Sequence, residues 1–473
     1  MVDSILWHDY ETWGVNPRAD FPVQFAAIRT DLSLNPIGKP INYFCQIPND
    51  YLPHPQACLV TGITPQQSLR DGYLECEFAA KVLAHMQEPK TCTAGYNSIK
   101  FDEEVTRNLL YRNFHPVYER EYEHGNSRWD VIDLVRAAYA LRPDGIQWPY
   151  YDDGKPCFKL EKLSEANGLE HKSAHDALSD VSATIGIAKL IKEKQPKLYD
   201  FYWQLRDKQN VLQEIDLVSH KPFLHVSGYI NSTQGCCSWF MPVCVHPTNR
   251  NAIIAINLEK DISVLSEYSI QQLQSNDMVT QLYQERRIPL MQIAINKVPF
   301  VAPAKMLTEE NAQRLGINRQ QCLANYQTLQ QMADLQIKCE LLFEREFNRD
   351  LKIDIDAQLY TREFPSAADK QVMNKIRNSK PEALSSLYHQ MLNPLYRAQL
   401  FRYMGRNFPN LMDQKDLEKW VAHRKERFVE GSDPAYLSLA GFQQQIEALA
   451  QQYGEDNKKL SILKQLERYA SEL

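Results

Sequence analysis

Two carboxylates separated by a single residue are the first feature of this sequence that could perform chemistry. The segment His8-Asp9-Tyr10-Glu11-Thr12 follows a short apolar run. Residues i and i+2 of a β-strand point to the same face, so Asp9 and Glu11 are expected to project side by side. Adjacent carboxylates repel unless a cation lies between them, and hard divalent cations prefer oxygen ligands. The pair indicates a metal site; the alternative is an edge strand that carries two solvated acids.

Two later motifs could complete such a site. A strand is expected to end near Gly95 and a helix to start near Phe101, which puts Asp102 in the first helical turn, where free backbone N–H groups favour a carboxylate. His175 is expected at the start of a later helix, with Asp180 one and a half turns further on. Taken singly, Asp102 could be an ordinary helix-start acid and His175 a capping residue. The order and spacing of the three motifs strengthen the metal-site interpretation.

The first 195 residues predict an α/β framework for these side chains. Strands are indicated by alternating or apolar runs at residues 4–7, 24–30, 41–47 and 91–96. Helices are indicated by three- and four-residue apolar spacing at 77–86, 101–111, 129–141 and 174–192. Strands mixed with helices in this way predict a sheet covered by helices.

The remainder of the chain changes character twice. After a short helix to about Leu212, β-like runs punctuated by Pro, Asn and Gly occupy 221–300 and predict a small barrel or open sheet with a helical insert at 262–286. From about residue 309 the pattern is almost entirely helical. The helices are expected at 309–315, 319–332, 337–346, 366–379, 381–403, 411–428 and 434–454.

Composition restricts the class of protein further. The ten cysteines form no C-x-x-C pair, so we interpret them as reduced thiols in the core. No apolar run of about 18 residues and no signal peptide is recognisable, so we expect no membrane span and a cytoplasmic location. The net charge of −6 argues mildly against a nucleic-acid partner, but a local basic groove can coexist with acidic faces elsewhere.

The three motifs together resemble the DEDDh exonuclease superfamily, and the whole chain is similar to a narrower group, the bacterial exonuclease I family. The blocks that carry this second resemblance are spread over nearly the full length. They are residues 24–29, 95–97, 126–130, 225–228, 315–319 and 356–360. The resemblance implies a ribonuclease H-like exonuclease domain at 1–195, an SH3-like β domain with helical insertions at 196–350 and a C-terminal helical domain at 351–473.

The resemblance also implies a reaction. A member of this family degrades single-stranded DNA processively in the 3′→5′ direction, releases nucleoside 5′-monophosphates and serves DNA repair and recombination. Two Mg²⁺ ions, for which Mn²⁺ can substitute, would assist the hydrolysis. The metal ligands would be Asp9, Glu11, Asp102 and Asp180. His175 would act as the general base that takes a proton from the attacking water.

Substrate and partner contacts follow from the same resemblance. Single-strand binding combines cations along the phosphates with aromatic rings under the bases, and Arg107, Tyr118 and Tyr122 match such positions. Glu11 would touch the terminal 3′-OH. Lys159 stands where the family often has arginine, and a lysine offers a point charge rather than a planar fork.

The family binds the acidic C-terminal tail of single-stranded DNA-binding protein. Arg142 and Lys221 match its basic pocket, whereas Thr308 and Gln330 stand where related enzymes carry arginine. We expect a monomer.

Two other functions remain open from the sequence. One is a catalytically silent scaffold for nucleic acid or protein, against which the intact set of four acids and His175 argues. The other is a related nuclease that acts mainly on RNA or duplex ends. The long β and helical extensions argue against oligoribonuclease, which is little more than the first domain.

Overall fold

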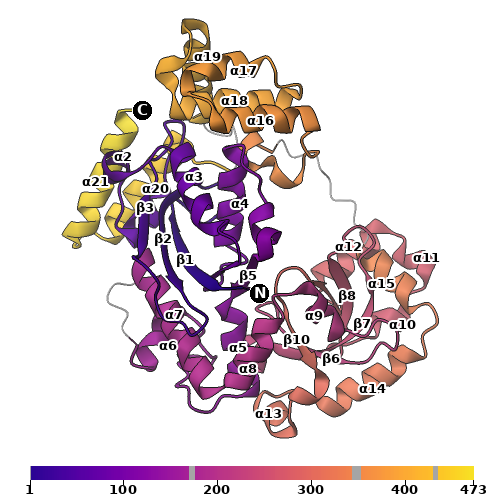
Figure 1. Ribbon diagram of the computed structural model, residues 1–473. Helices are drawn as coiled ribbons and strands as arrows, with labels where there is room; N and C mark the ends of the chain where they lie inside the picture. The colour runs from indigo at the N-terminus through magenta and orange to yellow at the C-terminus, as the bar shows by residue number, and fades with distance from the viewer. Residues whose placement is uncertain (1, 170–175, 344–352, 430–434) are drawn as a thin grey trace. The chain divides into compact units, whose positions relative to one another are not determined.

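The computed structural model describes residues 2–169, 176–343, 353–429 and 435–473 (Figure 1). The chain forms two compact units. The first unit comprises Met1–Ser127, Lys172–Ser182 and Lys352–Leu473, and the second comprises Arg128–His171 and Ala183–Leu351. Among the helices that the structure describes, none has the length and apolar character needed to cross a membrane.

The N-terminal five-stranded sheet is built around strand β1. Its strands are β1 (Ser4–Thr12), β2 (Pro22–Thr30), β3 (Ile41–Phe44), β4 (Thr91–Gly95) and β5 (Ser127–Asp130). Their order is β3-β2-β1-β4-β5. β1 pairs antiparallel with β2 and parallel with β4, so it lies inside the sheet and has a partner on both sides.

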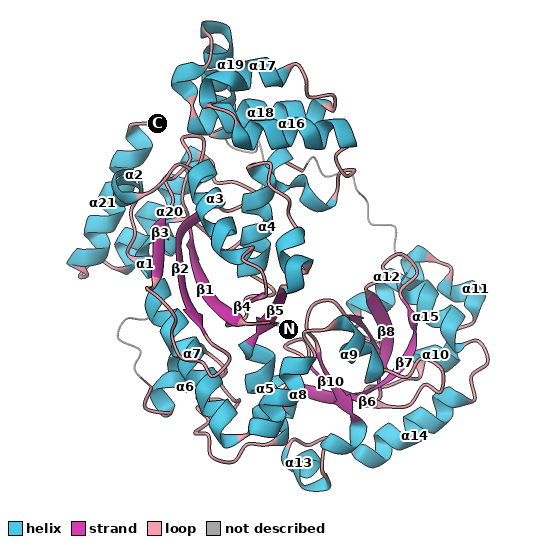
Figure 2. Cartoon of the chain, viewed as in Figure 1, coloured by secondary structure: helices cyan, strands magenta, loops and turns pink. Residues whose placement is uncertain are grey.

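Helices α3 (Glu75–Met86) and α4 (Asp102–Arg112) pack on one face of this sheet (Figures 1 and 2). The core between them contains Leu6 and Phe25 from the strands, and Phe78, Val82 and Leu109 from the helices, all of them fully buried. Burying each such side chain contributes roughly 1.5–3 kcal/mol. The face of β1 that carries Leu6 and Tyr10 is therefore held firmly against α4.

The C-terminal helices belong to the same unit. Their bounds are α16 (Ala367–Asn378), α17 (Leu384–Tyr388), α18 (Pro394–Asn407), α19 (Gln414–Arg427), α20 (Leu439–Gln452) and α21 (Asn457–Ser471). One core packs Trp13 and Phe21 against α20 and α21. Another packs Tyr111 and Phe114, at the end of α4, against α16 to α18. Two short helices near the N-terminal strands complete this unit, α1 (Pro55–Thr61) and α2 (Pro65–Asp71).

The second unit contains an antiparallel sheet of order β10-β6-β7-β8-β9. Its strands are β6 (Phe223–Val226), β7 (Cys237–Val245), β8 (Ala252–Asn257), β9 (Leu290–Ala294) and β10 (Phe300–Pro303). Its helices before the sheet are α5 (Val131–Leu141), α6 (Leu160–Ala166), α8 (Pro196–Gln204) and α9 (Lys208–Gln213). Those within or after it are α10 (Val264–Glu267), α11 (Ile270–Leu273), α12 (Asn276–Gln284), α13 (Glu309–Arg314), α14 (Arg319–Gln330) and α15 (Leu335–Phe343). Helix α7 (Ala177–Lys194) begins in the first unit and continues into the second.

Several expected elements differ from the structure. The helix expected at 129–141 begins at Val131, because Ser127–Asp130 forms β5 and the Asp130 side chain caps the helix by accepting a hydrogen bond from the Ile132 N–H. The helix expected at 381–403 is divided, since Pro394 starts α18 as a separate helix. The insert expected at 262–286 is three short helices, and α21 was not predicted at all.

The cysteine prediction is confirmed. All ten cysteines are free thiols, and all but Cys76 are buried. Burial raises the pKa of Cys76 to about 11, so it too stays protonated at neutral pH. No cysteine chemistry is therefore expected of the chain.

Candidate active site

Strand β1 presents Asp9 and Glu11 on one face. The strand's burial alternates over this stretch, because His8, Tyr10 and Thr12 are buried while Asp9 and Glu11 are partly accessible. A strand in an ordinary pleat produces this alternation. The pairing of Asp9 with Ala26 and of Glu11 with Gln24 fixes the register, which sets the two carboxylates side by side as expected.

Asp102 is placed by a tight connection from the neighbouring strand. β4 ends at Gly95, where a Cβ atom would come within 2.9 Å of the His8 carbonyl oxygen and 2.7 Å of the Ser98 Cβ. Only glycine permits this approach, and it brings the start of α4 against β1. The buried Asp102 is the first residue of α4, and its Oδ1 accepts a hydrogen bond from the Tyr10 N–H at 3.0 Å. Asp102 is thus fixed to the backbone between Asp9 and Glu11.

Asp180 reaches the same place from helix α7. The helix begins at Ala177, so Asp180 lies in its first turn, and its backbone N–H donates to the Asp176 carbonyl at 3.0 Å. The expected helix started three residues earlier, at Ala174. His175, the predicted general base, lies outside the described residues.

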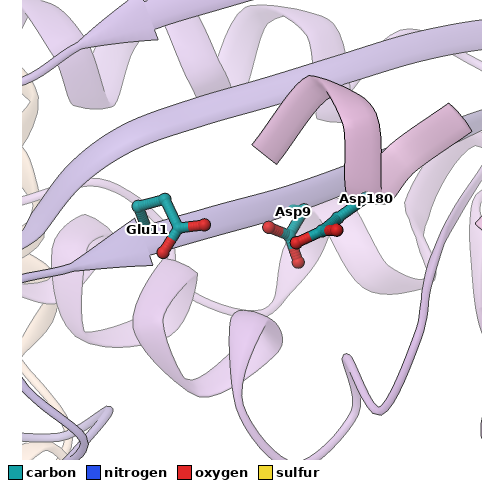
Figure 3. Close-up of side chains that lie close together, drawn as sticks. All are labelled: Asp9, Glu11 and Asp180. Atoms are coloured by element: carbon teal, nitrogen blue, oxygen red, sulfur yellow. The ribbon is translucent and has the colours of Figure 1, made fainter. Parts of the chain in front are cut away.

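The acidic side chains converge although they come from distant parts of the chain. One carboxylate oxygen from each of Asp9, Glu11 and Asp180 lies within 4.8 Å of the others. Figure 3 shows the carboxylates of Asp9 and Asp180 facing each other beside β1, with Glu11 further along the same strand. Among the residues that the structure describes, this is the one group of three or more such side chains with metal-binding spacing.

The cluster is electrostatically costly without a cation. Burial is the largest cause of the raised pKa values, and repulsion from neighbouring carboxylates adds to it. Burial, with Asp180 and Asp102 nearby, raises the pKa of Glu11 to about 8. Burial, with Asp102 and Glu11 nearby, raises the pKa of Asp9 well above its usual range.

This donor set fits divalent metal ions. Three carboxylates within a few ångströms provide only oxygen ligands, which Mg²⁺ and Mn²⁺ favour over the nitrogen and sulfur ligands typical of structural zinc sites. A bound cation would also remove the repulsion that raises the pKa values. The geometry therefore supports a site for divalent metal ions.

A second polar cluster, next to the acidic cluster, was not recognised in the sequence. Glu103 follows Asp102 on α4, and its Oε2 accepts a hydrogen bond from Arg120 Nη2 at 2.6 Å while its Oε1 accepts one from the Thr93 hydroxyl at 3.2 Å. His8, which precedes Asp9, lies 3.9 Å from Glu103. All of these side chains are buried. The cluster links the backbone segments that carry Asp9 and Asp102.

The predicted substrate residues have different surroundings. Arg107 is buried, and its guanidinium donates two hydrogen bonds to Glu121, at 2.7 and 2.8 Å, and one to Glu104 at 2.9 Å. The same guanidinium lies 5.3 Å from the centroid of the Tyr118 ring. Tyr122 is 64% exposed. Lys159 belongs to the second unit, where it is the exposed N-cap residue of α6.

Both predicted partner residues belong to the second unit. Arg142 follows α5 and donates a hydrogen bond to the Leu141 carbonyl, while the exposed Lys221 ammonium lies 3.9 Å from Asp216. Arg314, which the sequence did not single out, donates to the carbonyls of Tyr139 and Ala140 near the end of the same helix. Two arginines thus gather at the C-terminal end of α5, where the helix dipole favours positive charge.

Three protein-family models match consecutive parts of the chain. Residues 6–188 match the Exonuclease model, residues 206–345 the Exonuclease I SH3-like domain, and residues 353–473 the Exonuclease I C-terminal domain. The expected fold class is thereby confirmed, with a ribonuclease H-like exonuclease domain, an SH3-like β domain and a C-terminal helical domain.

Relatives that match over nearly the full length indicate the same family. The chain is 43% identical to exodeoxyribonuclease I of Escherichia coli, covering 99% of this chain and 98% of that protein. It is 42% identical to exodeoxyribonuclease I of Haemophilus influenzae over the same shares. A crystal structure of the E. coli enzyme with a dA16 oligonucleotide superimposes with a TM-score of 0.93 at 42% identity and covers 99% of both chains. The chain therefore belongs to the exonuclease I family of exodeoxyribonucleases, hydrolases that act on DNA.

Proposed function

We propose that this protein degrades single-stranded DNA processively from the 3′ end, releases nucleoside 5′-monophosphates, and serves DNA repair and recombination. The observation that carries the proposal is the convergence of Asp9, Glu11 and Asp180 within 4.8 Å. The similar E. coli enzyme has been solved with an oligonucleotide, and a structure of exonuclease I is described as suggesting how processivity is achieved.

Two divalent cations, Mg²⁺ or Mn²⁺, are the cofactors of the proposed reaction. Asp9, Glu11, Asp102 and Asp180 would hold them. When bound, such ions stabilise the charge that develops on the phosphate and help water to ionise. A structure of the E. coli enzyme with single-stranded DNA is described as a zinc-bound form, which supports the binding of a divalent metal in the family.

His175 is the proposed general base. An imidazole titrates near neutral pH, so it can take a proton from the attacking water and pass it to solvent. Its place in the sequence, five residues before Asp180, supports a position beside the acidic cluster.

The proposed substrate-binding residues are Glu11, Lys159, Tyr118, Tyr122 and Arg107. Glu11 would accept a hydrogen bond from the terminal 3′-OH, Lys159 would pair with a phosphate, and the tyrosine rings would stack on bases. Arg107 acts differently from the others, because its guanidinium is already paired with Glu121 and Glu104. It would support the Tyr118 ring from beneath rather than bind a phosphate.

The proposed partner is the acidic C-terminal tail of single-stranded DNA-binding protein. Arg142 and Lys221 would pair with its carboxylates. Arg314 on α13 adds a further cation at the C-terminal end of α5, where it donates to the carbonyls of Tyr139 and Ala140. A solved complex described as SSB/exonuclease I supports this partner for the family. We further propose domain boundaries at 195/196 and 350/351 and a monomeric protein.

One panel of substrates tests the function. Single-stranded DNA, duplex DNA and RNA of the same sequence are each incubated with Mg²⁺ and with excess chelator. We expect rapid hydrolysis of single-stranded DNA in Mg²⁺ and none in chelator. Preference for RNA or duplex ends would support the related-nuclease alternative, and binding without hydrolysis would support a silent scaffold.

A further inference from the structure

A short chain of hydrogen bonds connects strand β1 to helix α4 on the buried side of the strand. Tyr10 stands between Asp9 and Glu11 in the sequence, but its ring belongs to the opposite face of β1, where it is 4% exposed. The centroid of the ring lies 5.0 Å from that of Phe25, the residue that pairs with Tyr10 across β1 and β2. The two carboxylates therefore flank a side chain that the core holds in place.

The Tyr10 N–H forms the first link to α4. The pairing of β1 with β4 ends at Trp7 and Ala94, three residues before Tyr10. Buried N–H groups are almost always paired, and Asp102 Oδ1 accepts this hydrogen bond at 3.0 Å. The first residue of α4 thus supplies an acceptor that β4 is too short to provide.

The Tyr10 hydroxyl forms a second link to the same residue. The hydroxyl oxygen lies 3.1 Å from Thr106 Oγ1, and Thr106 Oγ1 lies 2.9 Å from the Asp102 carbonyl oxygen. A carbonyl oxygen can only accept, and a hydroxyl has a single proton to donate. Thr106 therefore donates to the Asp102 carbonyl and accepts from the Tyr10 hydroxyl. Thr106 is fully buried, so solvent does not compete for either bond.

One tyrosine thus holds Asp102 at two points. Its N–H fixes the carboxylate, and its hydroxyl fixes the main-chain carbonyl through Thr106. The Asp102 charge contributes to the raised pKa values of Asp9 and Glu11, so this carboxylate lies near the acidic cluster. Metal ligands must be held to within about 0.5 Å, and packing together with hydrogen bonds to the ligands provides this precision.

We propose that the hydroxyls of Tyr10 and Thr106 position Asp102 for metal binding, which makes Tyr10 a positioning residue of the reaction. The inference rests on the proposed function, in which Asp102 is a ligand of the divalent cations. Tyr10 and Thr106 act through Asp102 rather than on the metal or the strand. Loss of either hydroxyl would leave all four acids in the chain but loosen the start of α4.

The Mn²⁺ affinity of four proteins tests the proposal. Mn²⁺ is titrated into the full-length protein without DNA, and the paramagnetic signal of the free ion is followed. Tyr10→Phe keeps the ring and removes the hydroxyl, so we expect roughly 10- to 100-fold weaker binding, the usual effect of losing a group that orients a ligand. Thr106→Val keeps the shape and should weaken binding to a similar extent. Thr106→Ser keeps the hydroxyl and should bind like the unaltered protein.

A double variant shows whether the two hydroxyls act as one chain. Tyr10→Phe/Thr106→Val should lose no more Mn²⁺ affinity than the weaker-binding single variant, because either change already breaks the chain. Losses that multiply would overturn the proposal. Urea unfolding in chelator gives a metal-free readout of the same contact. Thr106→Val leaves the Tyr10 hydroxyl buried without this acceptor, so its midpoint should lie below that of the double variant.

Tyr202→Phe is the matched control in the second unit. The buried Tyr202 hydroxyl donates to the Val298 carbonyl at 3.0 Å. Its removal should change the unfolding equilibrium constant by roughly 2- to 12-fold, as in Tyr10→Phe, and leave the Mn²⁺ affinity unchanged. This difference separates positioning of Asp102 from a general loss of stability. An equal loss of Mn²⁺ affinity in Tyr202→Phe would overturn the proposal.

Two further results would also overturn it. One is Mn²⁺ binding by Tyr10→Phe that equals that of the unaltered protein, and the other is binding by Thr106→Ser as weak as that of Thr106→Val. An unaltered protein that binds no Mn²⁺ would refute the metal site itself and this inference with it. An unaltered protein that binds Mn²⁺ but does not hydrolyse single strands in Mg²⁺ would refute the proposed function alone.

Discussion

At the scale of single residues, the site balances function against stability. Asp9 and Glu11 come from one strand and Asp180 from a helix about 170 residues later, and the fold holds them close in spite of burial and repulsion. An acid whose pKa is raised by folding destabilises the folded state at any pH above its unfolded pKa. A bound cation would reverse this effect.

Neutralising Glu11 should therefore separate stability from activity. Glu11→Gln keeps the shape but removes the ionisable group whose pKa folding raises, so we expect the metal-free protein at pH 7 to gain about 1 kcal/mol of unfolding free energy. Hydrolysis in Mg²⁺ should fall by orders of magnitude. Urea unfolding in chelator and a hydrolysis assay measure the two effects. Asp3→Asn, at an exposed acid just before β1, should change neither. A Glu11→Gln protein less stable than the original would contradict this account.

His175 should affect the chemical step and leave binding unchanged. We expect His175→Ala to lower kcat by about 10²- to 10⁴-fold, the usual contribution of a general base, because water would then lose its proton without assistance. The affinity for single-stranded DNA should stay close to that of the unaltered protein in a chelator-containing titration. A near-normal kcat in this variant would disprove the assignment.

The proximity of Asp9 and Glu11 could be predicted from the sequence, whereas the contacts that support the surrounding segments could not. The i, i+2 spacing of Asp9 and Glu11 follows directly from strand geometry. The pairing of Arg107 with Glu121 and of Arg120 with Glu103 spans 14 and 17 residues across an irregular segment. No periodicity relates such positions, so their contacts become visible only in the folded chain.

At the scale of elements, α4 performs two tasks at its first turn. Asp102 accepts a hydrogen bond from the Tyr10 N–H beside the acidic cluster, and Glu103, the next residue, accepts hydrogen bonds from Arg120 and Thr93. Because these groups are buried, the ion pair determines where the helix starts relative to β1. A small shift of this start would move Asp102 away from Asp9.

Removing Arg120 should damage both stability and metal binding. Arg120→Met leaves Glu103 buried without its cation, which typically costs about 3–5 kcal/mol. Mn²⁺ affinity, followed by the paramagnetic signal of the free ion, should also decrease. The double variant Arg120→Met/Glu103→Gln should regain part of the stability, because no uncompensated charge then remains. Unchanged urea and Mn²⁺ midpoints in Arg120→Met would show that the pair has no positioning role.

The elements that were predicted wrongly have physical explanations. Trp129 and Asp130 belong to β5, but their apolar and acidic pattern continues smoothly into α5, so periodicity did not reveal the boundary. Pro394 indicated that a new helix begins there, because proline is tolerated in the first turn of a helix but not in its interior. The apolar spacing continues across Pro394, so the expected helix was drawn through it. Helix α21 carries Ile462, Leu463 and Leu466 at helical spacing, and this signal was present in the sequence although the prediction ended at residue 454.

At the scale of the whole molecule, a buried ion network joins distant parts of the first unit. Arg406 on α18 donates hydrogen bonds at 2.7–2.8 Å to Asp50, near the N-terminal strands, and at 2.5 Å to Asp356. Arg402 also donates to Asp356, at 2.9 Å. Burial alone would raise the pKa values of Asp50 and Asp356. The neighbouring arginines outweigh this effect and hold both pKa values well below the usual range.

Breaking this network should destabilise the first unit. Asp356→Asn leaves Arg402 and Arg406 without one carboxylate, so we expect a loss of about 3–5 kcal/mol at pH 7 by urea unfolding. Asp71→Asn, at an exposed acid of the same unit, is the matched control and should have little effect. An equally stable Asp356→Asn protein would show that the network contributes no net stability.

The same network predicts sensitivity to acid. Because the folded pKa values are depressed, the stabilisation is fully present above the unfolded value of about 3.9 and is lost as the pH falls below it. The urea midpoint should therefore fall steeply below about pH 4, and less steeply in Asp356→Asn. Equal slopes for the two proteins between pH 5 and pH 3 would contradict this interpretation.

The proposed reaction is hydrolysis of single strands from the 3′ end at the carboxylate cluster of β1 and α7, with the help of divalent metal. A single-stranded DNA labelled at its 5′ end tests it most directly. In Mg²⁺ the label should remain on progressively shorter strands and reach a mononucleotide last, and neither excess chelator nor the Asp9→Asn protein should give any shortening. Immediate release of the 5′ label, or equal shortening with chelator or with Asp9→Asn, would contradict the account.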